Sequence, residues 1–97
     1  MDIERIKENE KYLDECTEVI SGLNAQLDKM DAVREDMIKL FSYYGSEAWY
    51  EDLEGEVPEG VAAGVLSEDL IYDQITEVRD AAFRMLETAT DILKNRI

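Results

Sequence analysis

The sequence predicts an all-α protein in which two long antiparallel helices form a helical hairpin with a short connector helix between them. Apolar residues recur in steps of three and four over both ends of the chain. Four of the five glycines and the single proline gather between these ends, where the chain must turn back. With 97 residues, the chain has room for one domain, so we expect a single helical domain over residues 1–97.

The first long helix is expected over residues 2–44, where apolar side chains occupy two heptad positions of a coiled coil. Asp2 suits an N-cap, and Gly45 suits a left-handed termination. Gly22 costs about 1 kcal/mol relative to alanine, but the heptad continues through it, so we expect continuity or a mild bend, with a break as the alternative. The seam consists of Ile6, Leu13, Cys16, Ile20, Leu23, Leu27, Met30, Met37, Phe41 and Tyr44, interrupted by Arg34.

The connector is expected over residues 45–66. Ser46 can cap a short helix that contains Trp49 and stops at Gly55, and the proline and the remaining glycines then return the chain.

The second long helix is expected over residues 67–96. Ser67 suits its N-cap and is followed by two acids, while Lys94 and Arg96 place positive charge in the last turn, which complements the helix dipole. Its seam consists of Ile71, Ile75, Val78, Ala82, Met85, Ala89 and Ile92.

Helix lengths and extra apolar residues predict a homodimer. A 30-residue helix covers about 45 Å of a partner helix about 65 Å long, so the N-terminal end would overhang. Apolar side chains also lie outside both seams, and two helices cannot bury so wide a stripe. We favour a dimeric four-helix bundle over a monomer whose connector folds back as a third element. The additional residues are Val19, Val33, Ile38, Leu40, Leu70, Phe83, Leu86 and Leu93.

The charge balance argues against several classes of partner. The chain has 24 acidic and 10 basic residues, a formal net charge of -14, which repels nucleic-acid phosphates and anionic membranes. The chain starts with acidic residues rather than a basic signal region, has one cysteine, and lacks an apolar run of the roughly 18 residues that a membrane span needs. We expect a cytoplasmic protein without direct nucleic-acid or membrane binding.

The segment between Lys39 and Arg79 is acidic and aromatic. It contains no basic residue, ten acids and six of the eight aromatic residues. The aromatic side chains could cap the core while the acids solvate a loop, or together they could bind a protein partner. The candidate partner-binding residues are Tyr43, Tyr44, Trp49, Tyr50, Glu51, Asp52, Glu54, Tyr72 and Asp73.

The leading functional hypothesis is therefore a non-enzymatic protein interaction module. Carboxylates would steer a basic protein surface or peptide toward aromatic anchors. One alternative is an acidic decoy, whose carboxylates imitate the phosphates of DNA and occupy a nucleic-acid-binding protein.

The residue types offer little for catalysis, so no catalytic residue, metal or cofactor is predicted. Histidine is absent, Cys16 lies on an apolar seam without a nearby base, and no acidic run has the EF-hand spacing. A second alternative is an all-α Mg²⁺-dependent nucleotide pyrophosphohydrolase, which holds metal with an ExxE and a facing ExxD. The loosely matching residues are Glu51, Glu54, Glu77 and Asp80, but such pairs arise by accident in so acidic a chain.

Two stretches carry a resemblance to a known family. YYGSEAWYEDLEG (43–55) and GVLSEDLIYD (64–73), preceded by an acidic heptad helix, resemble a bacterial family of small helical proteins that is termed a domain of unknown function. The resemblance covers essentially the whole chain. It implies a cytoplasmic protein of Gram-positive bacteria and supplies no activity or site residue.

Overall fold

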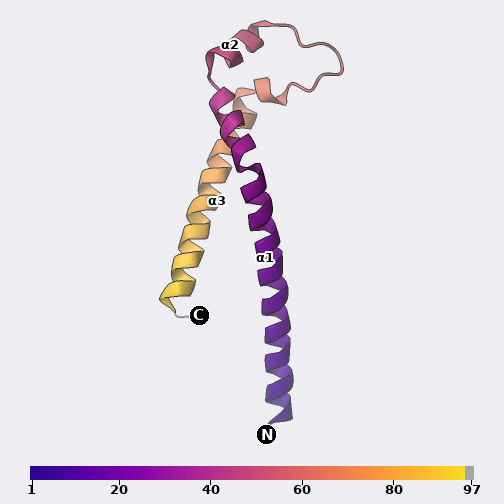
Figure 1. The fold of residues 1–97 in the computed structure, drawn as a ribbon, viewed down its shortest axis with the longest axis vertical. Helices are drawn as coiled ribbons and strands as arrows, with labels where there is room; N and C mark the ends of the chain where they lie inside the picture. The colour runs from indigo at the N-terminus through magenta and orange to yellow at the C-terminus, as the bar shows by residue number, and fades with distance from the viewer. Residues whose placement is uncertain (96–97) are drawn as a thin grey trace. The chain divides into compact units, whose positions relative to one another are not determined.

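The computed structural model describes residues 1–95, which form three α-helices and one short 3-10 helix, with no strand among them (Figure 1). The helices are α1 (Ile3–Tyr43), α2 (Glu47–Glu54), η1 (Gly64–Leu66) and α3 (Glu68–Lys94). The all-α prediction is confirmed, as are two long helices with a short helix between them. The described residues fall into two units, Met1–Ile38 and the part from Lys39 onward.

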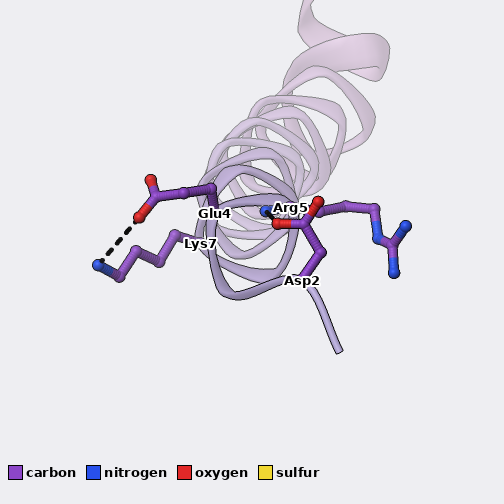
Figure 2. Close-up of polar contacts among 4 residues, drawn as sticks. All are labelled: Asp2, Glu4, Arg5 and Lys7. Atoms are coloured by element: carbon purple, nitrogen blue, oxygen red, sulfur yellow. Dashed lines mark hydrogen bonds and ion pairs between the residues drawn. The ribbon is translucent and has the colours of Figure 1, made fainter.

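The start of α1 is fixed by the predicted N-cap. The backbone N–H of Arg5 donates to Oδ1 of Asp2 at 3.1 Å (Figure 2). The N–H of Ile6 donates to the Asp2 carbonyl at 3.1 Å. These bonds satisfy two of the amides that a helix start leaves without partners. Lys7 and Glu4 form an ion pair at 3.6 Å, which contributes little because both side chains are exposed.

The middle of α1 is continuous through Gly22, so the alternative of a break is wrong. A Cβ atom placed on Gly22 would meet nothing within 4 Å. No close contact in this unit therefore requires a glycine at position 22.

The end of α1 follows the predicted glycine mechanism. Gly45 has a φ of +77°, the left-handed conformation that glycine adopts without a Cβ penalty. The N–H of Ser46 donates to the Tyr43 carbonyl at 3.0 Å, and the N–H of Tyr44 donates to the Leu40 carbonyl at 3.2 Å. Carbonyl groups that the helix end exposes are thereby satisfied, and the chain turns into α2.

Both later α-helices begin at the predicted serines. The Ser46 hydroxyl accepts a hydrogen bond from the N–H of Trp49 at 3.2 Å, and the Ser67 hydroxyl accepts one from the N–H of Leu70 at 3.4 Å. α2 ends at Gly55 as expected. The expected end of the last helix at Arg96 lies outside the described residues.

The 3-10 helix η1 was not expected from the sequence, which predicted only a return of the chain. It is held by two short-range bonds, Leu66 N–H to the Ala63 carbonyl and Ser67 N–H to the Gly64 carbonyl, both 3.0 Å. A three-residue helix has no apolar periodicity, so pattern analysis cannot detect it.

The second unit contains the two buried hydrophobic side chains among the described residues, Trp49 on α2 and Ile71 on α3, each 3% exposed. Contacts of η1 with both α2 and α3 join these elements. The first unit is one helix, and a single helix cannot bury its own apolar stripe. No helix within residues 1–95 is both long and apolar enough to cross a membrane.

Candidate functional site

Trp49 is the centre of the acidic and aromatic segment. Its indole Nε1–H donates to the Val65 carbonyl at 2.9 Å, which ties α2 to η1 across sixteen residues of sequence. Tyr44 and Tyr50 lie edge-on to its ring, each with centroids 5.1 Å away and interplanar angles of 69° and 74°. This geometry is favourable for aromatic pairs, so Trp49 serves as a packing centre.

Tyr43 links the end of α1 to α2. Its hydroxyl donates a hydrogen bond of 2.5 Å to Oδ2 of Asp52. This bond to a carboxylate raises the pKa of Tyr43, because it stabilises the protonated phenol, and desolvation and the Asp52 charge add to the effect.

The pKa of Tyr44 is affected by charges at the start of α3. Partial burial is the main cause that raises the pKa of this phenol, and the charges of Glu68 and Asp69 act in the same direction. Tyr44 therefore lies half-buried between the indole of Trp49 and an acidic helix start.

The remaining predicted site residues stay exposed. Tyr50 and Tyr72 are 58% and 61% exposed. The four carboxylate residues proposed for the site are exposed as well. These acids are Glu51, Asp52, Glu54 and Asp73. The predicted set thus divides into a packing group of Trp49 with Tyr44, a linking pair of Tyr43 with Asp52, and an exposed group.

The loop that follows α2 contains a concavity that was not predicted from the sequence. It has a volume of about 340 Å³, and its lining is mostly aliphatic, with carboxylates of Glu51, Asp52 and Glu56 among the lining groups. A signal was present, because valines recur every four residues through the connector. They are Val57, Val61 and Val65.

Residues considered for metal chemistry lie on two helices, Glu51 and Glu54 on α2, and Glu77 and Asp80 on α3. Within residues 1–95, no group of three or more Asp, Glu, Cys or His side chains is placed to hold a metal ion. Cys16 is exposed on α1.

The fold and the site define a class: a small acidic all-α protein with an aromatic connector between two long helices. The chain belongs to the family described as Domain of unknown function (DUF4298), whose family model matches residues 6–88. This match confirms the resemblance and includes both stretches that carry it, 43–55 and 64–73. No curated protein and no solved structure matches the chain.

Proposed function

We propose that this protein is a non-enzymatic interaction module that presents exposed side chains of the connector and of the start of α3 to a protein partner. One observation carries the proposal: Tyr50 and Tyr72 remain exposed although Trp49 beside Tyr50 is buried. The segment around them has ten acids and no basic residue between Lys39 and Arg79.

The physical basis is that one aromatic residue stabilises the segment while two others are free to contact a partner. Trp49 and its hydrogen bond to Val65 hold the segment in one conformation, so less conformational entropy is lost when a partner binds. Tyr50 and Tyr72 offer large amphipathic side chains of the type that anchors interfaces. The surrounding carboxylates attract a basic surface and accelerate its approach.

The apolar stripes of the long helices support a second part of the proposal, namely that α1 and α3 form an antiparallel hairpin and that two copies assemble into a four-helix bundle. Ile20 and Leu27 carry the heptad of α1 and are 46% and 37% exposed. Multi-angle light scattering should give a dimer mass. A monomer mass at micromolar concentration would contradict this part, whereas dimer loss in Ile20→Asp with Leu27→Asp would support it.

The function test compares two variants in protein capture from a bacterial lysate, which matches the cytoplasmic, bacterial setting that we propose. The connector variant removes two exposed aromatic rings and two charges while sparing Trp49 and Asp52. Its substitutions are Tyr50→Ala, Glu54→Gln, Tyr72→Ala and Asp73→Asn.

The control variant makes matched changes elsewhere. Tyr12 and Ile3 are similarly exposed, at 52% and 54%, and neither belongs to the apolar stripes that the proposed bundle would bury. Its substitutions are Ile3→Ala, Tyr12→Ala, Glu18→Gln and Glu87→Gln.

We expect a partner that the native protein and the control variant capture and the connector variant does not. Equal capture by both variants would refute a role for Tyr50, Tyr72 and the two acids changed with them in partner binding. Added duplex DNA provides a further arm, because release of the partner by DNA would favour an acidic decoy. Turnover of nucleoside triphosphates with Mg²⁺, abolished by Glu77→Gln, would instead establish the pyrophosphohydrolase.

A further inference from the structure

The concavity after α2 has walls that are held in place. One wall includes Val65 of η1, whose carbonyl accepts the indole hydrogen bond of Trp49 at 2.9 Å. Another includes Pro58 and Val61, which close a turn through a bond from the Val61 N–H to the Pro58 carbonyl at 3.2 Å. Gly60 has a φ of +87° at the position where a type II turn requires glycine.

The lining of this concavity is apolar and open to solvent. Val57, Val61 and Val65 are 40%, 58% and 42% exposed. Covering exposed aliphatic surface with a ligand makes the free energy of binding more favourable by about 25 cal/mol per Å². A volume of about 340 Å³ lies at the small end of ligand sites, which suits one long side chain and the residues beside it.

The charged groups of the lining are all acidic. Glu51, Asp52 and Glu56 contribute to it, and the sequence supplies no lysine or arginine between Lys39 and Arg79 that could neutralise them from within this segment. One oxygen of Asp52 already accepts from the Tyr43 hydroxyl. An apolar ligand would desolvate these carboxylates without pairing them, and an anionic ligand would be repelled.

We propose that this concavity binds an arginine side chain of a partner protein, presented in a short segment with small apolar neighbours. The inference rests on the proposed function and names the partner chemistry of the same connector. The aliphatic stem of arginine lies against the valines while its guanidinium meets the carboxylates. Arginine is favoured over lysine because its planar donors pair with carboxylates in a bidentate manner and its head is more weakly hydrated.

The test uses a defined probe, the tripeptide acetyl-Val-Arg-Ala-amide, titrated into ¹⁵N-labelled full-length protein. We expect saturable chemical-shift changes at the amides of Val57, Val61 and Val65. The same peptide with citrulline in place of arginine keeps the shape and loses the charge, and should bind about tenfold more weakly. The lysine peptide should fall between the two. Absence of saturable shifts with the arginine peptide would overturn the inference.

Matched variants separate a built site from diffuse attraction. Glu51→Gln with Glu56→Gln removes two charges from the lining, and Glu47→Gln with Glu59→Gln removes two charges from the same segment outside the lining. The first pair should weaken the peptide about tenfold and the second by less than about twofold. Equal losses would show attraction by net charge alone and would overturn the proposal.

A filling substitution tests the cavity itself. Ala62 lines the concavity, so Ala62→Leu should occupy the space and abolish the shifts at Val61 and Val65. Far-ultraviolet circular dichroism, together with an unchanged Trp49 indole N–H resonance, verifies that the connector stays folded. Peptide binding that persists in this folded variant would contradict the proposal.

The two proposals can fail separately. If the arginine peptide does not bind while the connector variant still loses its captured partner, only the arginine site is refuted. If the peptide binds as expected but native and connector variants capture the same proteins, the exposed tyrosines have no role in partner binding.

Discussion

The regular part of α1 and the irregular connector show opposite relations between sequence pattern and packing. Residues 3–38 carry an almost unbroken heptad, and no residue of α1 is buried. The connector has no heptad and only the short spacing of Val57, Val61 and Val65, yet Trp49 lies buried within it. The repeating pattern of α1 therefore predicts a helix with an apolar stripe, whereas the tertiary structure of the connector depends on one buried side chain of α2, Trp49.

The difference comes from the range of the contacts. Hydrogen bonds within α1 join residues three or four apart, as in the Asp2 cap and the bond from the Thr17 hydroxyl to the Leu13 carbonyl at 2.9 Å. In the connector, bonds span nine residues from Tyr43 to Asp52 and sixteen from Trp49 to Val65. Longer loops cost more closure entropy, so the connector depends on a few side chains that offset this cost.

The largest effect is expected from Trp49→Ala, which tests whether the packing of the connector depends on this one side chain. We expect a loss of about 3–5 kcal/mol in the free energy of unfolding of the connector, because the change empties a buried aromatic site and leaves the Val65 carbonyl without its donor. Urea unfolding followed by near-ultraviolet circular dichroism of the tyrosines measures it. Tyr50→Ala, at a ring 58% exposed, is the control and should cost less than about 1 kcal/mol. Similar losses in both variants would contradict a core centred on Trp49.

A second test compares neighbours on α3. Ile71→Ala should destabilise the second unit by about 2–4 kcal/mol, because Ile71 is 3% exposed. Tyr72→Ala removes a large side chain at 61% exposure that belongs to neither apolar stripe, and it should cost less than about 1 kcal/mol. Thermal unfolding of the two proteins at the same concentration decides the matter, and equal shifts in the melting temperature would place the apolar contact elsewhere on α3.

The sequence was sufficient for the helices because their signals are local. Asp2, Ser46 and Ser67 cap helices through side chains that reach amides three residues away, and Gly45 ends α1 through its own backbone conformation. Such signals need no knowledge of distant residues.

The candidate site could be predicted only in part, for the opposite reason. The clustering of aromatic residues and acids was visible in the sequence, but the burial of Trp49 depends on an acceptor sixteen residues away. The concavity depends on a turn at Gly60 and on η1, neither of which has a periodic pattern. The sequence pattern therefore identifies the segment but does not separate its packing residues from its exposed ones.

Gly22 in the regular part of α1 and Gly45 at the start of the connector allow a test with smaller expected effects. Gly22→Ala should stabilise α1 by about 0.5–1 kcal/mol, because a helical glycine costs conformational entropy and the new Cβ meets nothing within 4 Å. Gly45→Ala should destabilise the connector by about 1–2 kcal/mol, because an L-residue is strained at a φ of +77°. Circular dichroism melts of both variants measure the pair, and effects of the same sign would refute the different roles of these glycines.

The smallest effect concerns the Tyr43–Asp52 bond at high pH. The folded-state pKa of Tyr43 is raised from its ordinary value of 10.0, chiefly by the hydrogen bond to Asp52. The bond's contribution to stability is therefore fully present below about pH 10 and is lost as the pH rises through the folded-state pKa. Asp52→Asn removes the charged acceptor, so Tyr43 should then ionise at a lower pH.

A ¹³Cζ titration of the five tyrosines resolves this change. Glu8→Gln is the matched control, because the pKa of Tyr12 is raised in the same way by its bond to Glu8, within one turn of α1. Each substitution should lower the pKa of its own tyrosine. Only Asp52→Asn should also loosen a contact between two elements, seen as faster amide exchange at the start of α2. Unchanged exchange there would show that Tyr43 and Asp52 are neighbours that the connector holds together by other means, and would leave Trp49 and the helix caps to fix the turn.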